Sequence, residues 1–272
     1  MSARRIPGQV AKDFSEVLER LTGRDMQIID LLARHRIFTA DQLADLCFPS
    51  RWAARIRLVT LAEMEVLARF RDDNRSAFRY ALGIWGAAVH AWRRNETPPT
   101  KSAVTQAVHQ LAVSQKRSHL EGVNSFFTTI AAEARADGGS VRLAEWRSED
   151  EAASMFLGKV RPDGAMTLVG DSEAAGTYFF EYDTGSETLE ILTAKLDRYA
   201  SRQPVGGHRR VLVQLTRPRR EANLHHRLAR HTLPFVVATT TAVNGLFGDC
   251  WRPVGHAERV SLRMLGIRAV LS

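Results

Sequence analysis

A polar stretch with two adjacent prolines interrupts the chain and divides it into two folding regions. Residues 95–101 have the sequence Asn-Glu-Thr-Pro-Pro-Thr-Lys. Neither a helix interior nor a central strand accepts consecutive prolines, because proline lacks the backbone N–H and fixes φ. The chain has 272 residues, a length typical of two domains. We therefore predict one domain over residues 1–100 and a second over residues 101–272.

The first region has three helical patterns followed by two strand patterns. Apolar residues recur at helical spacing over 25–33, a capping threonine begins a shorter helix over 39–46, and 51–64 has a third apolar face. Residues 66–71 and 77–82 alternate around a polar turn, as the strands of a β-hairpin do. Three short helices and a hairpin follow the order of a winged helix-turn-helix domain.

Arginines on the third helix and the hairpin are candidates for DNA contact. They are Arg51, Arg55 and Arg57 on the helix, and Arg75 and Arg79 on the hairpin. In helix-turn-helix proteins the recognition helix enters the major groove, where a guanidinium binds guanine edges or phosphates through two hydrogen bonds. We therefore predict that this face binds double-stranded DNA. A protein-docking or dimerisation domain is the alternative.

The charge balance also favours a polyanionic partner. The chain carries 38 basic and 30 acidic residues, a formal net charge of +8. Its two cysteines are too few for a disulfide framework or a four-thiolate zinc site. No apolar run reaches the about 18–20 residues that cross a bilayer, and the amino terminus lacks the apolar core of a signal peptide. We expect a cytoplasmic protein that binds nucleic acid and no membrane.

The second region alternates helices and strands in the order α-β-β-β-α-β-α-β. The expected elements are a long helix over 103–136, strands over 140–147, 160–169 and 177–183, a helix over 187–201, a strand over 211–215, a helix over 222–230 and a strand over 235–239. This order predicts a mixed α/β or α+β architecture, in which helices flank a mixed sheet.

Acidic residues from two of these strands are expected to meet. The second and third strands flank the turn-rich segment 171–176, which predicts an antiparallel hairpin. In such a hairpin the numbers of paired residues have a constant sum, so Asp163 is expected beside residues 181–183. Glu181 and Asp183 share one strand face, because side chains alternate along a strand. The sequence therefore predicts three carboxylates at one sheet edge.

Three neighbouring carboxylates repel one another and need a cation, a shared proton or arginine partners. Oxygen ligands suit Mg²⁺ or Mn²⁺ better than zinc. We predict that Asp163, Glu181 and Asp183 bind such an ion, and that Lys195 on the next helix orients a water or stabilises a phosphate. In the alternative, arginines neutralise these acids and Lys195 coats a helix surface.

The motifs around these residues resemble those of the replication-relaxation family, whose members are encoded mainly by actinobacterial plasmids and integrative elements. The similar segments are Arg161-Pro162-Asp163, residues 179–187, residues 194–199, residues 109–113 and residues 146–149. Together with the amino-terminal helices and hairpin, the resemblance covers most of residues 20–252.

This resemblance implies that the second domain is similar to the PD-(D/E)xK nuclease superfamily, whose restriction-endonuclease-like core has the order α-β-β-β-α-β. Asp163, after a proline, matches the first acid of the motif, and Glu181 matches the second. The position two residues after Glu181, where the superfamily has a lysine, is Asp183. Lys195 is the candidate for a lysine that has migrated to the following helix.

The resemblance implies a DNA-binding protein of a mobile element. Its expected activity is metal-dependent nicking or cleavage of DNA in plasmid replication, relaxation or transfer, with Glu149, or alternatively Glu121, as a further acid. The rival hypothesis is a catalytically inactive regulator that uses the second domain for dimerisation or partner docking, which Asp183 in the lysine position favours. The expected partners are double-stranded DNA, a second copy of the chain, and plasmid replication or transfer proteins.

Overall fold

The computed structural model describes residues 13–138, 141–170, 175–202 and 210–268. The chain forms two compact units, Met1–Asn124 and Ser125–Ser272. Their boundary lies inside helix α7 (Arg117–Ala136) and not at the prolines. None of the helices within these described ranges is long and apolar enough to span a membrane.

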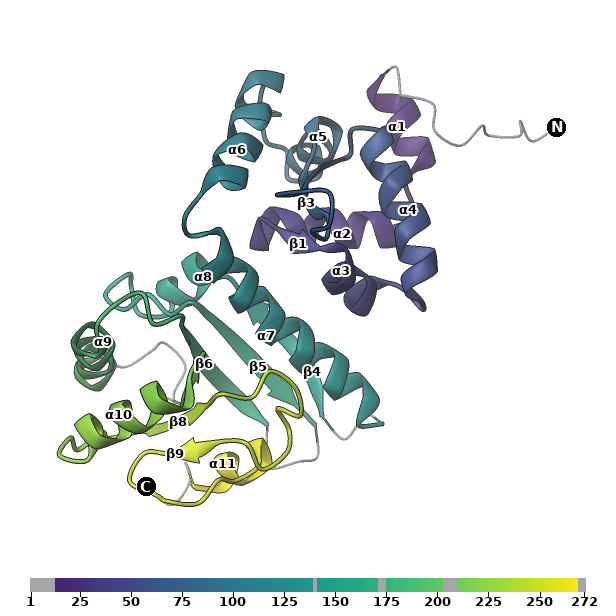
Figure 1. The fold of residues 1–272 in the computed structure, drawn as a ribbon. Coiled ribbons are helices and arrows are strands. Elements are labelled where there is room, and N and C mark those ends of the chain that lie inside the picture. The colour runs from purple at the N-terminus through teal and green to yellow at the C-terminus, as the bar shows by residue number, and fades with distance from the viewer. Residues whose placement is uncertain (1–12, 139–140, 171–174, 203–209, 269–272) are drawn as a thin grey trace. The chain divides into compact units, whose positions relative to one another are not determined.

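The N-terminal unit combines short helices with a three-stranded antiparallel sheet of order β1-β3-β2 (Figure 1). Before α7, its elements are α1 (Phe14–Arg20), α2 (Gly23–His35), β1 (Phe38–Thr39), α3 (Ala40–Cys47), α4 (Arg51–Glu63), β2 (Leu67–Phe70), β3 (Arg79–Leu82), α5 (Ile84–Arg93) and α6 (Lys101–Val113). Capping boxes begin two of the helices, with Thr22 and Asp25 at α2 and with Thr39 and Gln42 at α3. Strands β2 and β3 form the predicted hairpin.

The N-terminal unit continues past the prolines because α6 and the beginning of α7 pack onto it. Leu111 of α6 lies in a buried cluster with Ile37. The side-chain amide of Asn124 donates to the carbonyl of Ile37 at 2.6 Å. In place of the one helix expected over 103–136 there are two, because α6 ends before Ser114. The hydroxyl of Ser114 accepts a hydrogen bond from the backbone N–H of Lys116.

The C-terminal unit is a six-stranded mixed sheet with helices on both faces (Figure 1). Besides the end of α7, its elements are β4 (Arg142–Arg147), α8 (Glu149–Ser154), β5 (Gly164–Val169), β6 (Gly176–Asp183), α9 (Leu189–Ser201), β7 (Arg210–Leu215), α10 (Pro218–Leu228), β8 (Val236–Thr240), β9 (Arg252–Pro253) and α11 (Leu262–Arg268). The strand order is β4-β5-β6-β7-β8-β9, with β6, β7 and β8 parallel and the other pairs antiparallel. This is an α+β fold of the expected mixed type.

The two faces of this sheet are covered by different helices. Phe126 of α7 stacks on Phe180 with ring centroids 3.8 Å apart. On the opposite face, α9 and α10 pack over a core that includes Leu196 and Phe179. Because side chains alternate along β6, Glu181 lies on the same face as Phe179. Glu181 therefore lies on the face of the sheet that α9 covers.

The hairpin that joins these acids is formed by β5 and β6. The strands pair antiparallel, with Ala165 opposite Phe179 and Gly164 opposite Phe180. The predicted turn over 171–176 falls partly outside the described residues. A Cβ atom on Gly164 would lie 2.7 Å from the ring of Phe127, so the first residue of β5 must be glycine for the strand to approach α7 this closely.

Candidate active site

The β5–β6 hairpin brings Asp163 beside Glu181. Asp163 directly precedes β5, and its backbone N–H donates to the carbonyl of Phe180 at 3.0 Å. Its carboxylate Oδ2 accepts the backbone N–H of Tyr182 at 2.7 Å. These two hydrogen bonds fix the Asp163 side chain against the end of β6, next to Glu181.

Helix α9 supplies the remaining polar groups of this site. Lys195 Nζ contacts Glu181 Oε2 and lies 3.6 Å from Asp163 Oδ1. Tyr199, one helical turn later, donates its hydroxyl to Glu181 Oε1 at 2.8 Å. Residues distant in the sequence therefore form one cluster: two carboxylates, an ammonium and a phenol.

The cluster is largely removed from water. The side chain of Glu181 is 4% exposed, whereas those of Asp163 and Lys195 are 16% and 21% exposed. Burial and the nearby Asp163 carboxylate raise the pKa of Glu181, against the opposing effects of Lys195 and Tyr199. Burial would lower the pKa of Lys195, but the two carboxylates outweigh it and raise that pKa. A cation near Glu181 therefore stabilises the ionised form of this buried carboxylate.

Asp183, the third predicted carboxylate, has a different partner. Arg220 Nε, at the start of α10, lies 3.0 and 2.9 Å from its two oxygens. The backbone N–H of Gly185 donates to Asp183 Oδ1 at 2.7 Å, and Arg220 also donates to the carbonyl of Glu187 at 2.6 Å. Asp183 thus ties the segment between β6 and α9 to α10.

Glu149 and Glu121, the two further acids considered, lie in different surroundings. Glu149 begins α8, is 57% exposed and binds Arg161 at 3.1 Å. Its charge contributes to the raised pKa of Lys195, which places it within electrostatic range of the cluster. Glu121 belongs to the N-terminal unit, where it binds Arg79 at 2.6 Å.

The described residues offer two carboxylates, not three, to a divalent ion. No group of three histidine, cysteine or acidic side chains suited to a metal occurs among them. Asp163 and Glu181 nevertheless both face one cation, the ammonium of Lys195. Mg²⁺ is commonly bound by one or two carboxylates, with waters and substrate phosphates completing its shell. The donor set of Asp163 and Glu181 therefore fits Mg²⁺, without Asp183.

The predicted DNA-contacting arginines separate into structural and exposed ones. Arg57 binds the fully buried Asp25, with Nε 3.0 Å from Oδ1. Arg79 binds Glu121, as described above, and Asp72. Both guanidiniums are held inside the N-terminal unit by these ion pairs. They connect elements of the unit rather than project from it.

The other three predicted arginines are exposed. Arg51 pairs with Asp41 and Asp45 and is still 65% exposed. Within the described ranges, no ion pair involves the guanidinium of Arg55 or Arg75. These two side chains are the predicted arginines with the greatest freedom to bind a phosphate.

Two further arginines near the hairpin, which were not among the predicted residues, lie beside aromatic side chains. Arg69 and Arg71 lie over the ring of Phe78 at 5.0 and 4.7 Å. Burial raises the pKa of Tyr80, while the charges of Arg69 and Arg55 oppose that shift, so both guanidiniums lie near this tyrosine. The alternation of Arg69 and Arg71 along a strand was the available signal.

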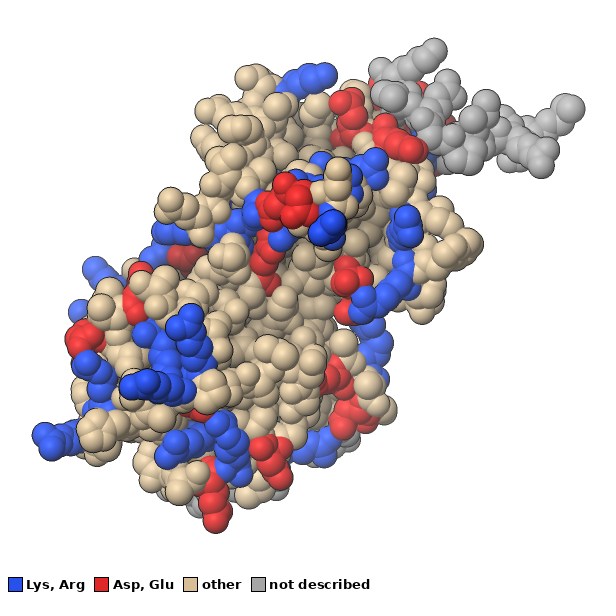
Figure 2. Space-filling view, in the orientation of Figure 1, with Lys and Arg blue, Asp and Glu red and all other residues tan. Residues whose placement is uncertain are grey.

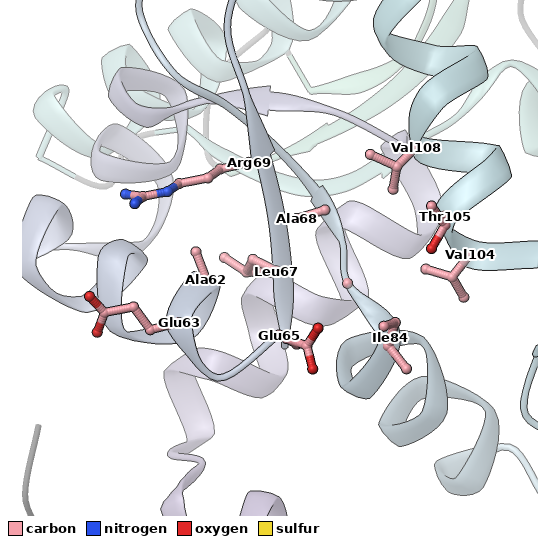
Figure 3. Close-up of a pocket in the computed structure, with 11 residues that line it drawn as sticks. Ala62, Glu63, Glu65, Leu67, Ala68, Arg69, Ile84, Val104, Thr105 and Val108 are labelled. Atoms are coloured by element: carbon pink, nitrogen blue, oxygen red, sulfur yellow. The ribbon is translucent and has the colours of Figure 1, made fainter. Parts of the chain in front are cut away.

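A cavity of about 390 Å³ lies in the N-terminal unit, apart from all these predicted residues (Figure 3). Apolar side chains from α4, β2 and α6 line most of it, including Leu67, Val104 and Val108. Its charged side chains, Glu63 and Arg69 among them, do not converge on one point in Figure 3. The cavity therefore has no arrangement comparable to the carboxylate cluster of the C-terminal unit.

Comparison with known protein families identifies the family of this chain. The family model for replication-relaxation proteins matches residues 29–208. This segment includes α4, the β2–β3 hairpin and the cluster of Asp163, Glu181, Lys195 and Tyr199. Searches of curated proteins and of solved structures give no match. Since the matched segment makes up well over half of the chain, the protein belongs to the replication-relaxation family.

Proposed function

We propose that this protein binds duplex DNA through its N-terminal unit and hydrolyses a phosphodiester bond in its C-terminal unit with the help of Mg²⁺. The family suggests a role in the replication or relaxation of mobile elements. One observation carries the enzymatic part: Asp163 and Glu181, from two paired strands, both face the ammonium of Lys195.

The order of elements in the N-terminal unit supports the DNA-binding part. The succession α2-β1-α3-α4-β2-β3 agrees with the order expected of a winged helix-turn-helix domain. In this proposal α4 enters the major groove and presents Arg55, while Arg69, Arg71 and Arg75 of the hairpin contact phosphates. Arg57 and Arg79 instead hold the fold together through their ion pairs.

The order of elements around the carboxylates supports a PD-(D/E)xK-like nuclease domain. Helix α7, strands β4 to β6, helix α9 and strand β7 follow the α-β-β-β-α-β order of that superfamily, with the short α8 inserted. In this proposal Lys195 takes the role of the lysine that superfamily members have two residues after the second acid. Its contact with Glu181 gives this substitution a physical basis.

The geometry supports a proposed chemical role for each residue. Asp163 and Glu181 would hold Mg²⁺, which when bound supplies positive charge to the phosphate and favours ionisation of a water. Lys195, 21% exposed beside both carboxylates, would orient the attacking water and stabilise negative charge on the phosphate. Glu149, close enough to affect Lys195, remains a candidate for the further acid.

Exposed arginines near the end of β7 would bring the DNA backbone to this site. Arg217 and Arg219 flank the start of α10, next to the Arg220 that binds Asp183. Both are exposed, and within the described ranges neither has an ion pair. Lysine and arginine side chains gather over the part of the unit that carries α9 and α10 (Figure 2).

Incubation of supercoiled plasmid with Mg²⁺ tests this function. The wild type is expected to yield nicked or linear DNA, and Asp163→Ala and Lys195→Ala to leave it supercoiled. Asp197→Ala is the matched control, because Asp197 is an exposed acid on α9, the helix of Lys195, and its ion pair within the described ranges is with His231. Supercoiled plasmid left intact by the wild type, with Mg²⁺ and with Mn²⁺, would reject the nuclease.

The second candidate is a DNA-binding regulator without catalytic activity. The observation that favours it is Asp183, which occupies the position of the superfamily lysine and is neutralised by Arg220. Sequence-selective DNA binding that is unaffected by Asp163→Ala, in a protein that does not cut DNA, would establish this alternative. In that case the C-terminal unit would serve dimerisation or partner docking.

A further inference from the structure

We propose that Tyr199 is a positioning residue, which fixes the Glu181 carboxylate in the orientation that binds a divalent cation. The inference rests on the proposed cation site but not on DNA cleavage. Its basis is that two side chains of α9 each contact one oxygen of this carboxylate. The Tyr199 hydroxyl donates to Oε1 at 2.8 Å, and Lys195 contacts Oε2.

The phenol of Tyr199 is itself held firmly. The residue is fully buried. Its ring is perpendicular to that of Phe156 at 5.3 Å and lies 6.0 Å from Phe179 and 6.2 Å from Phe235. Aromatic contacts of this kind restrict both side-chain torsions. The hydroxyl is therefore a fixed point to which Glu181 Oε1 is attached.

A neutral donor orients a carboxylate without cancelling its charge. Asp183, on the same face of β6, shows the contrast, because Arg220 contacts both of its oxygens and neutralises it. Glu181 has the neutral phenol on one oxygen and the ammonium of Lys195 on the other, and Lys195 also faces Asp163, so these two carboxylates share one positive charge. In this proposal Asp183 stabilises the fold through its ion pair with Arg220, whereas Glu181 binds the divalent cation together with Asp163.

Removal of the hydroxyl would leave Glu181 Oε1 buried without this donor. Glu181 is 3% exposed, so water does not readily replace the lost hydrogen bond. The carboxylate would then rotate toward other donors, and its second oxygen would leave the position facing Asp163. Loss of a hydrogen-bond partner to a metal-binding side chain typically costs about 10–100-fold in metal affinity.

The test measures Mn²⁺ binding to the full-length protein without DNA. The electron paramagnetic resonance signal of free Mn²⁺ gives the amount that is not bound. We expect Tyr199→Phe to weaken Mn²⁺ binding about 10–100-fold, and Glu181→Gln to abolish it. The matched control is Tyr178→Phe, since Tyr178 is also fully buried on β6 but lies on the opposite face beside Arg210. Thermal unfolding of each variant shows whether it is folded.

The outcomes separate this inference from the nuclease proposal. If folded Tyr199→Phe binds Mn²⁺ with wild-type affinity while Glu181→Gln does not bind it, the positioning role is overturned and the proposed cation site remains supported. Equal losses in Tyr199→Phe and Tyr178→Phe would show a merely structural effect and also overturn it. A wild type that binds no Mn²⁺ would overturn it too. Selective loss in Tyr199→Phe supports it even if the protein does not cut DNA.

Discussion

Arg220 binds both carboxylate oxygens of Asp183, with its Nε atom 3.0 and 2.9 Å from them. Glu181, two positions earlier on the same face of β6, instead contacts one ammonium and one phenol. The ion pair of Asp183 links the end of β6 to α10, whereas Glu181 is directed toward Asp163 and Lys195. Two acids that look equivalent in the sequence therefore have different partners, and we propose two different roles for them.

The first prediction concerns these two roles. Asp183→Ala should lower the free energy of unfolding by about 3 kcal/mol, because it leaves the largely buried Arg220 charge without its partner. The same variant should bind Mn²⁺ like the wild type, whereas Asp163→Ala should not bind it. Urea unfolding and Mn²⁺ titration measure both effects. Weaker Mn²⁺ binding in folded Asp183→Ala would identify Asp183 as a ligand after all.

Local patterns in the sequence were sufficient to place Asp163 beside Glu181. The alternation of the two strands and the turn between them define the register of an antiparallel hairpin, and the structure has this pairing. Lys195 was a candidate because it lies on the helix that follows the strand of Glu181 and Asp183, and this helix packs on the sheet face that carries Glu181. Short-range geometry determines each of these placements.

The partners of charged residues could not be predicted in this way. Arg220 lies 37 residues from Asp183, and Arg57 lies 32 residues from Asp25. Each pair depends on how two separate elements pack, which no local periodicity encodes. The extent of the N-terminal unit could not be predicted for the same reason. Leu111 and Asn124 follow the prolines in the sequence, but they pack onto this unit through contacts between separate elements.

The second prediction separates two neighbouring arginines of α4. Arg57→Ala should lower the free energy of unfolding by about 3 kcal/mol, because Asp25 is fully buried and would lose its cation. Arg55→Ala, at an exposed position, should change stability by less than about 0.5 kcal/mol. It should instead weaken DNA binding and reduce the slope of log affinity against log salt by about one. Fluorescence anisotropy with labelled duplex DNA at several salt concentrations measures this slope; an unchanged slope would remove Arg55 from the interface.

The third prediction concerns the exposed arginines at the start of α10. The double variant Arg217→Ala, Arg219→Ala should reduce the salt slope of DNA binding by about two, since each arginine is assigned one phosphate contact. Mn²⁺ binding should stay at the wild-type level, because neither side chain contacts the carboxylates. The control is Arg142→Ala, which removes an arginine from β4 at the far edge of the sheet. A slope that changes equally in the control would indicate a general charge effect rather than a defined contact surface.

The fourth prediction concerns the pH dependence of stability. His35 is 4% exposed, and burial, together with the charge of Arg34, lowers its pKa from 6.5 to about 3. Between these two values the unfolded chain binds a proton at this residue and the folded chain does not. The free energy of unfolding should therefore fall as the pH decreases from 6.5 toward 3, by up to about 1.4 kcal/mol per pH unit. Denaturant unfolding at a series of pH values should show a shallower acid dependence for His35→Gln, whereas His226→Ala, at an exposed position of α10, should retain the wild-type dependence. Identical pH profiles for the wild type and His35→Gln would mean that His35 is protonated as readily in the folded protein as in the unfolded chain.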